Sequence, residues 1–111
     1  MTQGIISITK KNKVIFKCVA GCNGFNAKKT AKAIQKKARY DLQSIYDICV
    51  KNDFGDKDCS LIVQSENDWI GAGRDESKQL PKLYTEKFND ADFNPRWEYG
   101  TAPHTEIIKL K

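Results

Sequence analysis

The sequence predicts an α+β fold, a two-layer sandwich in which helices pack on one face of a mostly antiparallel sheet. Three observations favour this class: the chain opens with two strand-like segments around a polar turn, continues with a helical pattern, and then returns to strand-like segments. With 111 residues, the chain is expected to form a single domain, 1–111, with one modest core.

The first predicted unit is an N-terminal hairpin. Residues 4–9 (GIISIT) and 14–19 (VIFKCV) have the composition of strands, and the polar segment 10–13 (KKNK) is suited to the turn between them. The glycine-containing segment 20–25 then leads toward a helix.

The second predicted unit is helical. Asn26 is the expected N-cap of a helix that starts at Ala27. One apolar stripe with spacings of three and four residues continues to residue 49: Ala27, Ala31, Ile34, Ala38, Leu42, Ile45 and Cys49. This stripe fits either one continuous helix or two helices with a break at 40–41, where Asp41 would cap the second helix, which ends near residue 52. In either case Gly55 is suited to the left-handed position that follows a helix.

The remaining elements are mainly strands. Residues 59–64 have the strongest pattern of a central strand, and a turn at 65–68 leads to a return strand. Leu80, Leu83, Tyr84 and Phe88 have helical spacing. The predicted elements after the second helix are strands 59–64, 69–72, 97–99 and 105–110 and a short helix at 80–89.

Positive charge is concentrated in the first 40 residues. They contain ten Lys or Arg residues and no Asp or Glu, so they carry +10, while the rest of the chain carries −5. This split favours a binding or adaptor role with an acidic protein or another anionic partner, and also self-association that pairs the two halves. The simpler interpretation is that these lysines only solvate the helix and the turn.

The predicted first helix carries most of the candidate binding residues. Its lysines follow one another at helical spacing, so they are expected to share one face. The alternative partner is a nucleic acid, whose phosphates the lysine-rich helix 27–39 would follow. The candidate anion- or partner-binding residues are Asn26, Lys28, Lys29, Lys32, Lys36, Lys37 and Arg39.

The loop Gly21–Gly24 is a second candidate anion site. It lies between a predicted strand and a predicted helix, where backbone N–H groups can hold an anion. Lys29 and Thr30 follow at a spacing close to that of a phosphate-binding loop, but the glycine that should precede the lysine is missing. A tight strand-to-helix connection needs the same glycines, so both interpretations stay open.

An enzyme is the less favoured alternative, and no catalytic residue is assigned. Thr2 could act as an N-terminal nucleophile, since the opening of the chain is similar in topology to N-terminal-nucleophile hydrolases. Alternatively, a small hydrolase could use His104 and Glu98 as an acid–base pair. A pocket around that histidine would contain Arg96, Trp97, Tyr99 and His104.

No cofactor or metal site is predicted. The four cysteines, Cys18, Cys22, Cys49 and Cys59, lack a C-x2-C pair, and only one histidine accompanies them. We expect free, mostly buried thiols in a reducing cytosol. No apolar run has the length of a membrane span, so we expect a cytoplasmic protein without membrane contact.

In its size, its opening MTQGIISI hairpin and its lack of a catalytic motif, the chain resembles the small, uncharacterised single-domain proteins of phages, prophages and integron gene cassettes. Such proteins commonly act by binding. The resemblance therefore implies a non-enzymatic role, and it carries over no functional residue.

Overall fold

The computed structural model describes residues 3–37, 39–55, 61–66, 68–72, 96–97, 100–101 and 104–111. Its helices are α1 (Ala27–Lys37) and α2 (Leu42–Lys51), and the 3-10 helix η1 (Gly24–Asn26) precedes α1. Its strands are β1 (Gly4–Lys10), β2 (Lys13–Ala20), β3 (Leu61–Ser65), β4 (Trp69–Ala72), β5 (Arg96–Trp97), β6 (Gly100–Thr101) and β7 (His104–Leu110).

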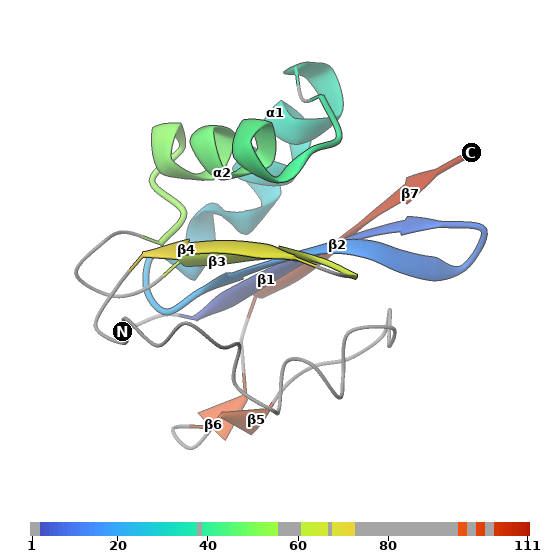
Figure 1. Cartoon of the computed structure of the whole chain (residues 1–111). Coiled ribbons are helices and arrows are strands. Elements are labelled where there is room, and N and C mark those ends of the chain that lie inside the picture. Colours follow the sequence, from blue (N-terminus) through green and yellow to red (C-terminus); the bar gives the residue numbers. More distant parts are fainter. Residues whose placement is uncertain are drawn as a thin grey trace.

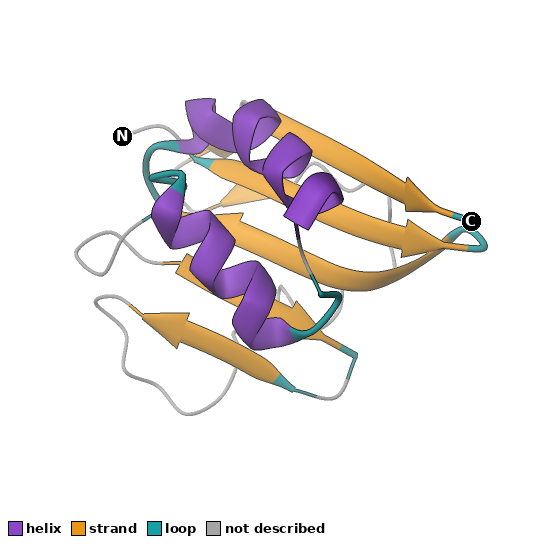
Figure 2. Ribbon diagram, turned by 90° about the horizontal axis from the view of Figure 1, so that it is seen from above, coloured by secondary structure: helices purple, strands orange, loops and turns teal. Residues whose placement is uncertain are grey.

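Five strands form one sheet in the order β4-β3-β2-β1-β7, and both helices lie on one face of it (Figures 1 and 2). All neighbours are antiparallel except β1 and β7, which run parallel. The α+β prediction with helices on one face of a mostly antiparallel sheet is therefore confirmed. The parallel placement of β7 beside β1 was not predicted.

The predicted N-terminal hairpin is confirmed, with a turn of two residues. Lys11 and Asn12 both have positive φ, 53° and 65°. Two positive φ values in succession are typical of the type I′ turn, whose twist matches that of the flanking strands. The pairing register shifts between Ile8 and Thr9, which makes a β-bulge in the hairpin.

The start of α1 differs from the prediction. Asn23, with φ 58°, precedes η1, and η1 continues directly into α1, so Asn26 is not an N-cap. The Asn26 backbone N–H instead donates to the Asn23 carbonyl at 3.0 Å. The Asn26 side-chain amide donates to the carbonyl of Asp53 at 2.8 Å, which ties this turn to the end of α2.

Both ends of α2 are capped. Asp41 is the predicted N-cap, and its Oδ1 accepts a hydrogen bond from the Ser44 N–H at 2.8 Å. At the other end, Asp53 takes the left-handed position with φ 59°, and the Phe54 N–H donates to the Cys49 carbonyl at 2.9 Å. This arrangement is typical of a Schellman motif. Gly55, which was predicted to take this left-handed position, also has positive φ. It lies two residues after Asp53, however, so it does not end the helix.

The main core lies between the sheet and the helices. α1 packs on β7 and β1, and α2 packs on β3 and β4. Alanines at the buried face of α1 let this helix approach the strands closely. The sheet contributes Ile6, Ile8, Cys18, Ala20, Leu61, Val63 and Ile108, and the helical layer contributes Ala27, Ala31, Ile34, Ile45, Cys49 and Phe54.

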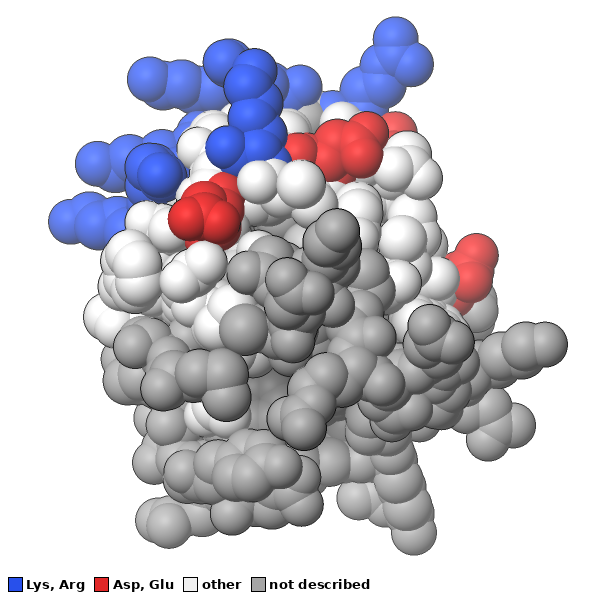
Figure 3. Space-filling view, turned by 90° about the vertical axis from the view of Figure 1, so that its left-hand side faces the viewer, with Lys and Arg blue, Asp and Glu red and all other residues white. Residues whose placement is uncertain are grey.

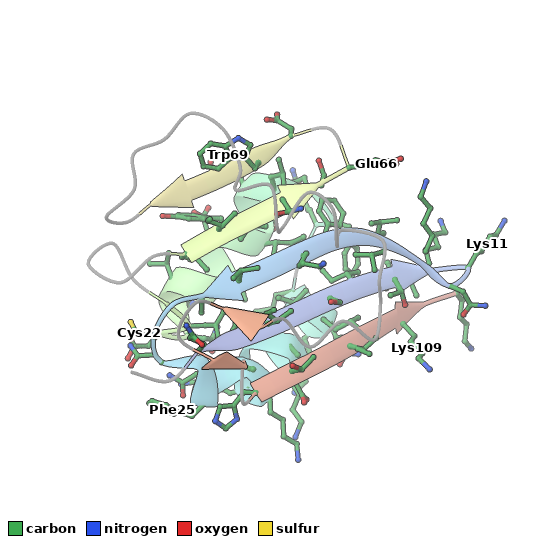
Figure 4. The ribbon with its side chains drawn as sticks, turned by 90° about the horizontal axis from the view of Figure 1, so that it is seen from below. Lys11, Cys22, Phe25, Glu66, Trp69 and Lys109 are labelled. Carbon is green, nitrogen blue, oxygen red and sulfur yellow. The ribbon has the colours of Figure 1, made fainter. Side chains whose placement is uncertain are left out.

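The opposite face of the sheet is also buried, which the sequence did not predict. The β5–β6 pair lies on this side (Figures 1 and 4). Ser7 of β1, Lys17 of β2 and Gln64 of β3 are neighbours in register on this face, and all three are almost completely buried. A polar row therefore crosses the sheet on the face away from the helices.

Some predicted elements lie outside the described residues. These are the first two residues of the predicted strand 59–64, the predicted helix 80–89 and the last two residues of the predicted strand 97–99. The predictions for strands 69–72 and 105–110 are confirmed by β4 and β7.

Candidate anion-binding surface

The solvent-facing side of α1 is built from lysines. Thr30 and Ile34 are among the residues on its buried side, while every lysine of the helix is exposed. In Figure 3 the Lys and Arg side chains gather on the helical side of the molecule. We call the five exposed lysines of this helix the helix patch: Lys28, Lys29, Lys32, Lys36 and Lys37.

The lysines of the helix patch form no salt bridge with a carboxylate among the described residues. α1 itself contains no Asp or Glu. The salt bridge found in the described part of the chain joins Lys13 to Glu66, with Nζ 3.2 Å from Oε1, and it lies in a different region. Carboxylates lie beside the basic side chains in Figure 3, but none of the described ones is at salt-bridge distance from a lysine of α1.

This arrangement lowers the stability of α1. Lys28 and Lys32, and Lys32 and Lys36, are like-charged pairs four residues apart, each of which costs about 0.2–0.5 kcal/mol. Lys28 and Lys29 also occupy the first turn, where the helix dipole disfavours cations. An anion bound along this face would relieve both effects.

Arg39 and Asn26 lie at opposite ends of the helix patch. Arg39 is exposed in the connection to α2, where its backbone N–H donates to Ser44 Oγ at 3.2 Å. Arg39 therefore extends the positive charge past the end of α1. Asn26 lies at the start, and its amide already bonds to the Asp53 carbonyl, so its clearest role is to hold the turn.

A second group of lysines lies at the tip of the β1–β2 hairpin. Lys10, Lys11 and Lys13 are exposed there. Because β7 runs parallel to β1, Leu110 lies opposite Lys10, and the C-terminal lysines come to the same end (Figure 4). We call this group the hairpin end: Lys10, Lys11, Lys13, Lys109 and Lys111. The sequence did not indicate the last two, because no local pattern specifies a parallel partner for β1.

Lys17 does not belong to either group. It was counted with the positive charge of the first 40 residues, but its side chain is 1% exposed. It lies on the sheet face away from the core that the helices cover, between Ser7 and Gln64. The basic surface is therefore smaller than the charge count suggested.

The glycine loop at 21–24 serves packing. A Cβ on Gly24 would lie 2.2 Å from the backbone carbon of Gln3, so only glycine fits there. The loop also carries a negative neighbour, since Asn23 Nδ2 donates to Asp53 Oδ1 at 3.3 Å. These contacts support the tight strand-to-helix connection as the reason for the glycine at position 24.

The candidate enzyme residues are only partly described. His104 is partly exposed at the start of β7, opposite Gly4 of β1. Arg96 and Trp97 are described as the backbone of β5, and Thr2 and Tyr99 lie outside the described residues. Of the predicted pocket, the His104 side chain alone is therefore placed.

The cysteines divide into two kinds. Cys18 and Cys49 are free and buried, as expected, but Cys22 is disulfide-bonded, so the expectation of free thiols is wrong for this residue. A hydrogen bond with Cys49, together with burial, raises the pKa of the Cys18 thiol well above its ordinary value.

The described residues contain neither a metal-binding cluster nor a membrane-spanning helix. They contain no cluster of three or more His, Cys, Asp or Glu side chains that could hold a metal ion. None of their helices combines the length and apolar character needed to cross a membrane.

Comparison with protein-family models, with curated proteins and with solved structures finds no match for this chain. Its function is therefore inferred from the chemistry of its own surface.

Proposed function

We propose that this protein is a binding module that holds an anionic partner, an acidic protein segment, on the helix patch. The observation that carries the proposal is the exposed lysine row of α1, which forms no salt bridge with a carboxylate among the described residues. The row also opposes the stability of its own helix through like-charge pairs, while the dipole effects of its first-turn and last-turn lysines offset each other. Residues that weaken local stability without any structural compensation are typical of functional surfaces.

The proposal is tested by binding of a fluorescently labelled polyglutamate peptide, measured as fluorescence anisotropy at low and high salt. Two triple variants separate position from charge. K28Q/K32Q/K36Q changes the helix patch, and K10Q/K11Q/K13Q changes the hairpin end. Both remove three positive charges, so an effect of net charge alone would weaken binding equally in the two variants.

We expect the wild-type protein to bind the peptide at low salt and to lose affinity as salt screens the charges. The helix-patch variant should lose at least tenfold more affinity than the hairpin-end variant. Equal losses in the two variants, or no binding by the wild-type protein at low salt, would contradict the proposal.

A nucleic acid is the second candidate partner, and one observation favours it. Phe25 in η1 is 59% exposed and comes directly before α1, so its ring is available to stack on a base beside Lys28 and Lys29. If this candidate is correct, a single-stranded oligonucleotide should bind more tightly than polyglutamate of equal charge. The substitution Phe25→Ala should then weaken oligonucleotide binding and leave peptide binding unchanged.

Self-association remains part of the proposal. Asp41 and Asp47 of the α2 region are exposed, so they could meet the helix patch of a second copy. Sedimentation velocity at low and high salt tests this pairing. A dimer that dissociates as salt rises is the expected result, and a monomer under both conditions would remove self-association.

Location in the cell and biological origin stay predictions. The expectation of free thiols assumed a reducing cytosol, and the disulfide at Cys22 instead favours an oxidising compartment. The resemblance to proteins of phages and other mobile elements agrees with a binding role, but it supplies no partner.

A further inference from the structure

Cys18 and Cys49 form a thiol pair that the proposed function does not use. Cys18 belongs to β2 and Cys49 to α2, and both side chains are 0% exposed. Both are free, and the side chain of Cys49 hydrogen-bonds to that of Cys18. The two side chains, which come from different elements, are thus close enough to interact inside the protein.

The packing of the core accounts for this contact. In the sheet, Cys18 lies in register between Ile6 of β1 and Val63 of β3, and all three belong to the core cluster beneath the helices. α2 packs on β3, and Cys49 is a buried residue of this helix in the same cluster. The two thiols therefore share one apolar space between the sheet and α2.

The remaining cysteine chemistry of the chain bears on this pair. Cys22 is disulfide-bonded, and a structural disulfide persists in an oxidising compartment. A chain that keeps one disulfide there is exposed to the same oxidants at its other cysteines while it folds. Thiols that share one core cluster can reach the S–S distance of about 2 Å while the chain folds.

We propose that Cys18 and Cys49 form a second disulfide, which ties β2 to α2 through the core when the chain folds in an oxidising compartment. The oxidant is a small-molecule disulfide such as glutathione disulfide. One cysteine thiolate attacks it and releases one glutathione thiol, leaving a mixed disulfide. The second cysteine attacks the protein sulfur of that mixed disulfide and releases the second glutathione. One S–S bond forms in the protein, and two electrons and two protons pass to glutathione.

The bond must form before the core closes, because both thiols are inaccessible in the folded protein. The test therefore starts from the reduced, unfolded full-length chain. The chain is refolded in a buffer of reduced and oxidised glutathione, quenched with acid, unfolded, and treated with N-ethylmaleimide. The mass of the intact chain then gives the number of thiols that reacted.

The proposal predicts no maleimide adduct on the refolded protein and four adducts after full reduction. Two adducts would mean that the disulfide at Cys22 forms alone, and four would mean that no disulfide forms. Either of these results overturns the proposal.

The variant Cys22→Ser identifies the bonded pair. With Cys22 removed, the proposal predicts one adduct. It also predicts that trypsin under non-reducing conditions releases residues 18–28 covalently linked to residues 40–51. Three adducts, or the absence of this linked peptide from the refolded variant, would overturn the proposal. Because Cys18 and Cys49 are unchanged in this variant, their core packing is kept.

Discussion

Replacing Lys28, Lys32 and Lys36 with Gln should stabilise the folded protein, even though these are the lysines we propose to bind the partner. The three side chains are exposed, so their replacement changes no core contact. Gln and Lys have nearly equal helix propensity, so the intrinsic preference of α1 is also kept. What changes is the electrostatic energy of the helix.

The size of the effect follows from the positions of the three lysines in α1. The substitution removes two like-charged pairs four residues apart, each costing about 0.2–0.5 kcal/mol. It also removes Lys28 from the first turn, where a cation costs about 0.3–1 kcal/mol at low ionic strength, and Lys36 from the last turn, where a cation contributes about the same amount, so these two effects nearly cancel. The removal of the two like-charged pairs therefore raises the free energy of unfolding by about 0.4–1 kcal/mol, which corresponds to roughly 2–4 °C in Tm for a chain of this size.

The assay is urea unfolding, followed by circular dichroism, at about 0.01 M and about 1 M salt, where the Debye length is about 30 Å and about 3 Å. The gain should appear at low salt and disappear at high salt. Lys51→Gln is the matched control, because Lys51 ends α2, where the helix dipole favours a cation. The free energy of unfolding of this control should fall by about 0.3–1 kcal/mol at low salt, whereas that of the triple variant should rise.

Two results would refute this reasoning about α1. If the triple variant were no more stable than the wild-type protein at low salt, the lysines would have to be compensated in the folded state. A gain of equal size at high salt would also refute it, because screened charges cannot be its source.

Three further predictions concern the fold. Gly24→Ala should lower the free energy of unfolding in urea by about 3 kcal/mol or more, because its Cβ would lie 2.2 Å from the Gln3 backbone. A decrease below about 1 kcal/mol would show that the two backbones are not in close contact. Asp41→Ala should cost about 1 kcal/mol by removing the hydrogen bond to Ser44, and an unchanged stability would argue against the cap. In the reduced protein, the folded state raises the pKa of Cys18 above 9.0, so its contribution to stability is complete below that pH and is lost as pH rises further. Unfolding measured between pH 8 and pH 11 should show this loss in the reduced protein and not in a protein with the Cys18–Cys49 disulfide; equal alkaline losses in both forms would contradict it.

Short sequence patterns correctly predicted the elements that are stabilised by interactions between residues close together in the chain. The hairpin follows from two apolar segments around a polar turn, and the break between α1 and α2 follows from the capping side chain of Asp41. The sequence was wrong about Asn26, because the turn that begins at Asn23 precedes it and takes up its backbone N–H. The choice between these two asparagines depends on contacts with Asp53, far along the chain.

Non-local pairing explains what the sequence could not predict about the basic surface. Helical spacing predicted that Lys28, Lys32 and Lys36 form one stripe of α1, and all five lysines of this helix are exposed in the structure. Lys17 was wrongly counted with the exposed positive charges. Both faces of β2 are buried, so its sequence does not alternate between apolar and polar residues, and no pattern indicated that the face with Lys17 is covered. Lys109 and Lys111 were missed, because only the parallel pairing of β7 with β1 brings them to the hairpin end.

The central claim is that the helix patch is the surface that contacts an anionic partner. It is tested most directly by recording backbone amide NMR spectra of the protein during a titration with polyglutamate at low salt. The account predicts that the largest and saturable shift changes fall on residues 28–37, with smaller changes on β3 and β4. Changes confined to the hairpin end, or spread evenly over all exposed lysines, would contradict it.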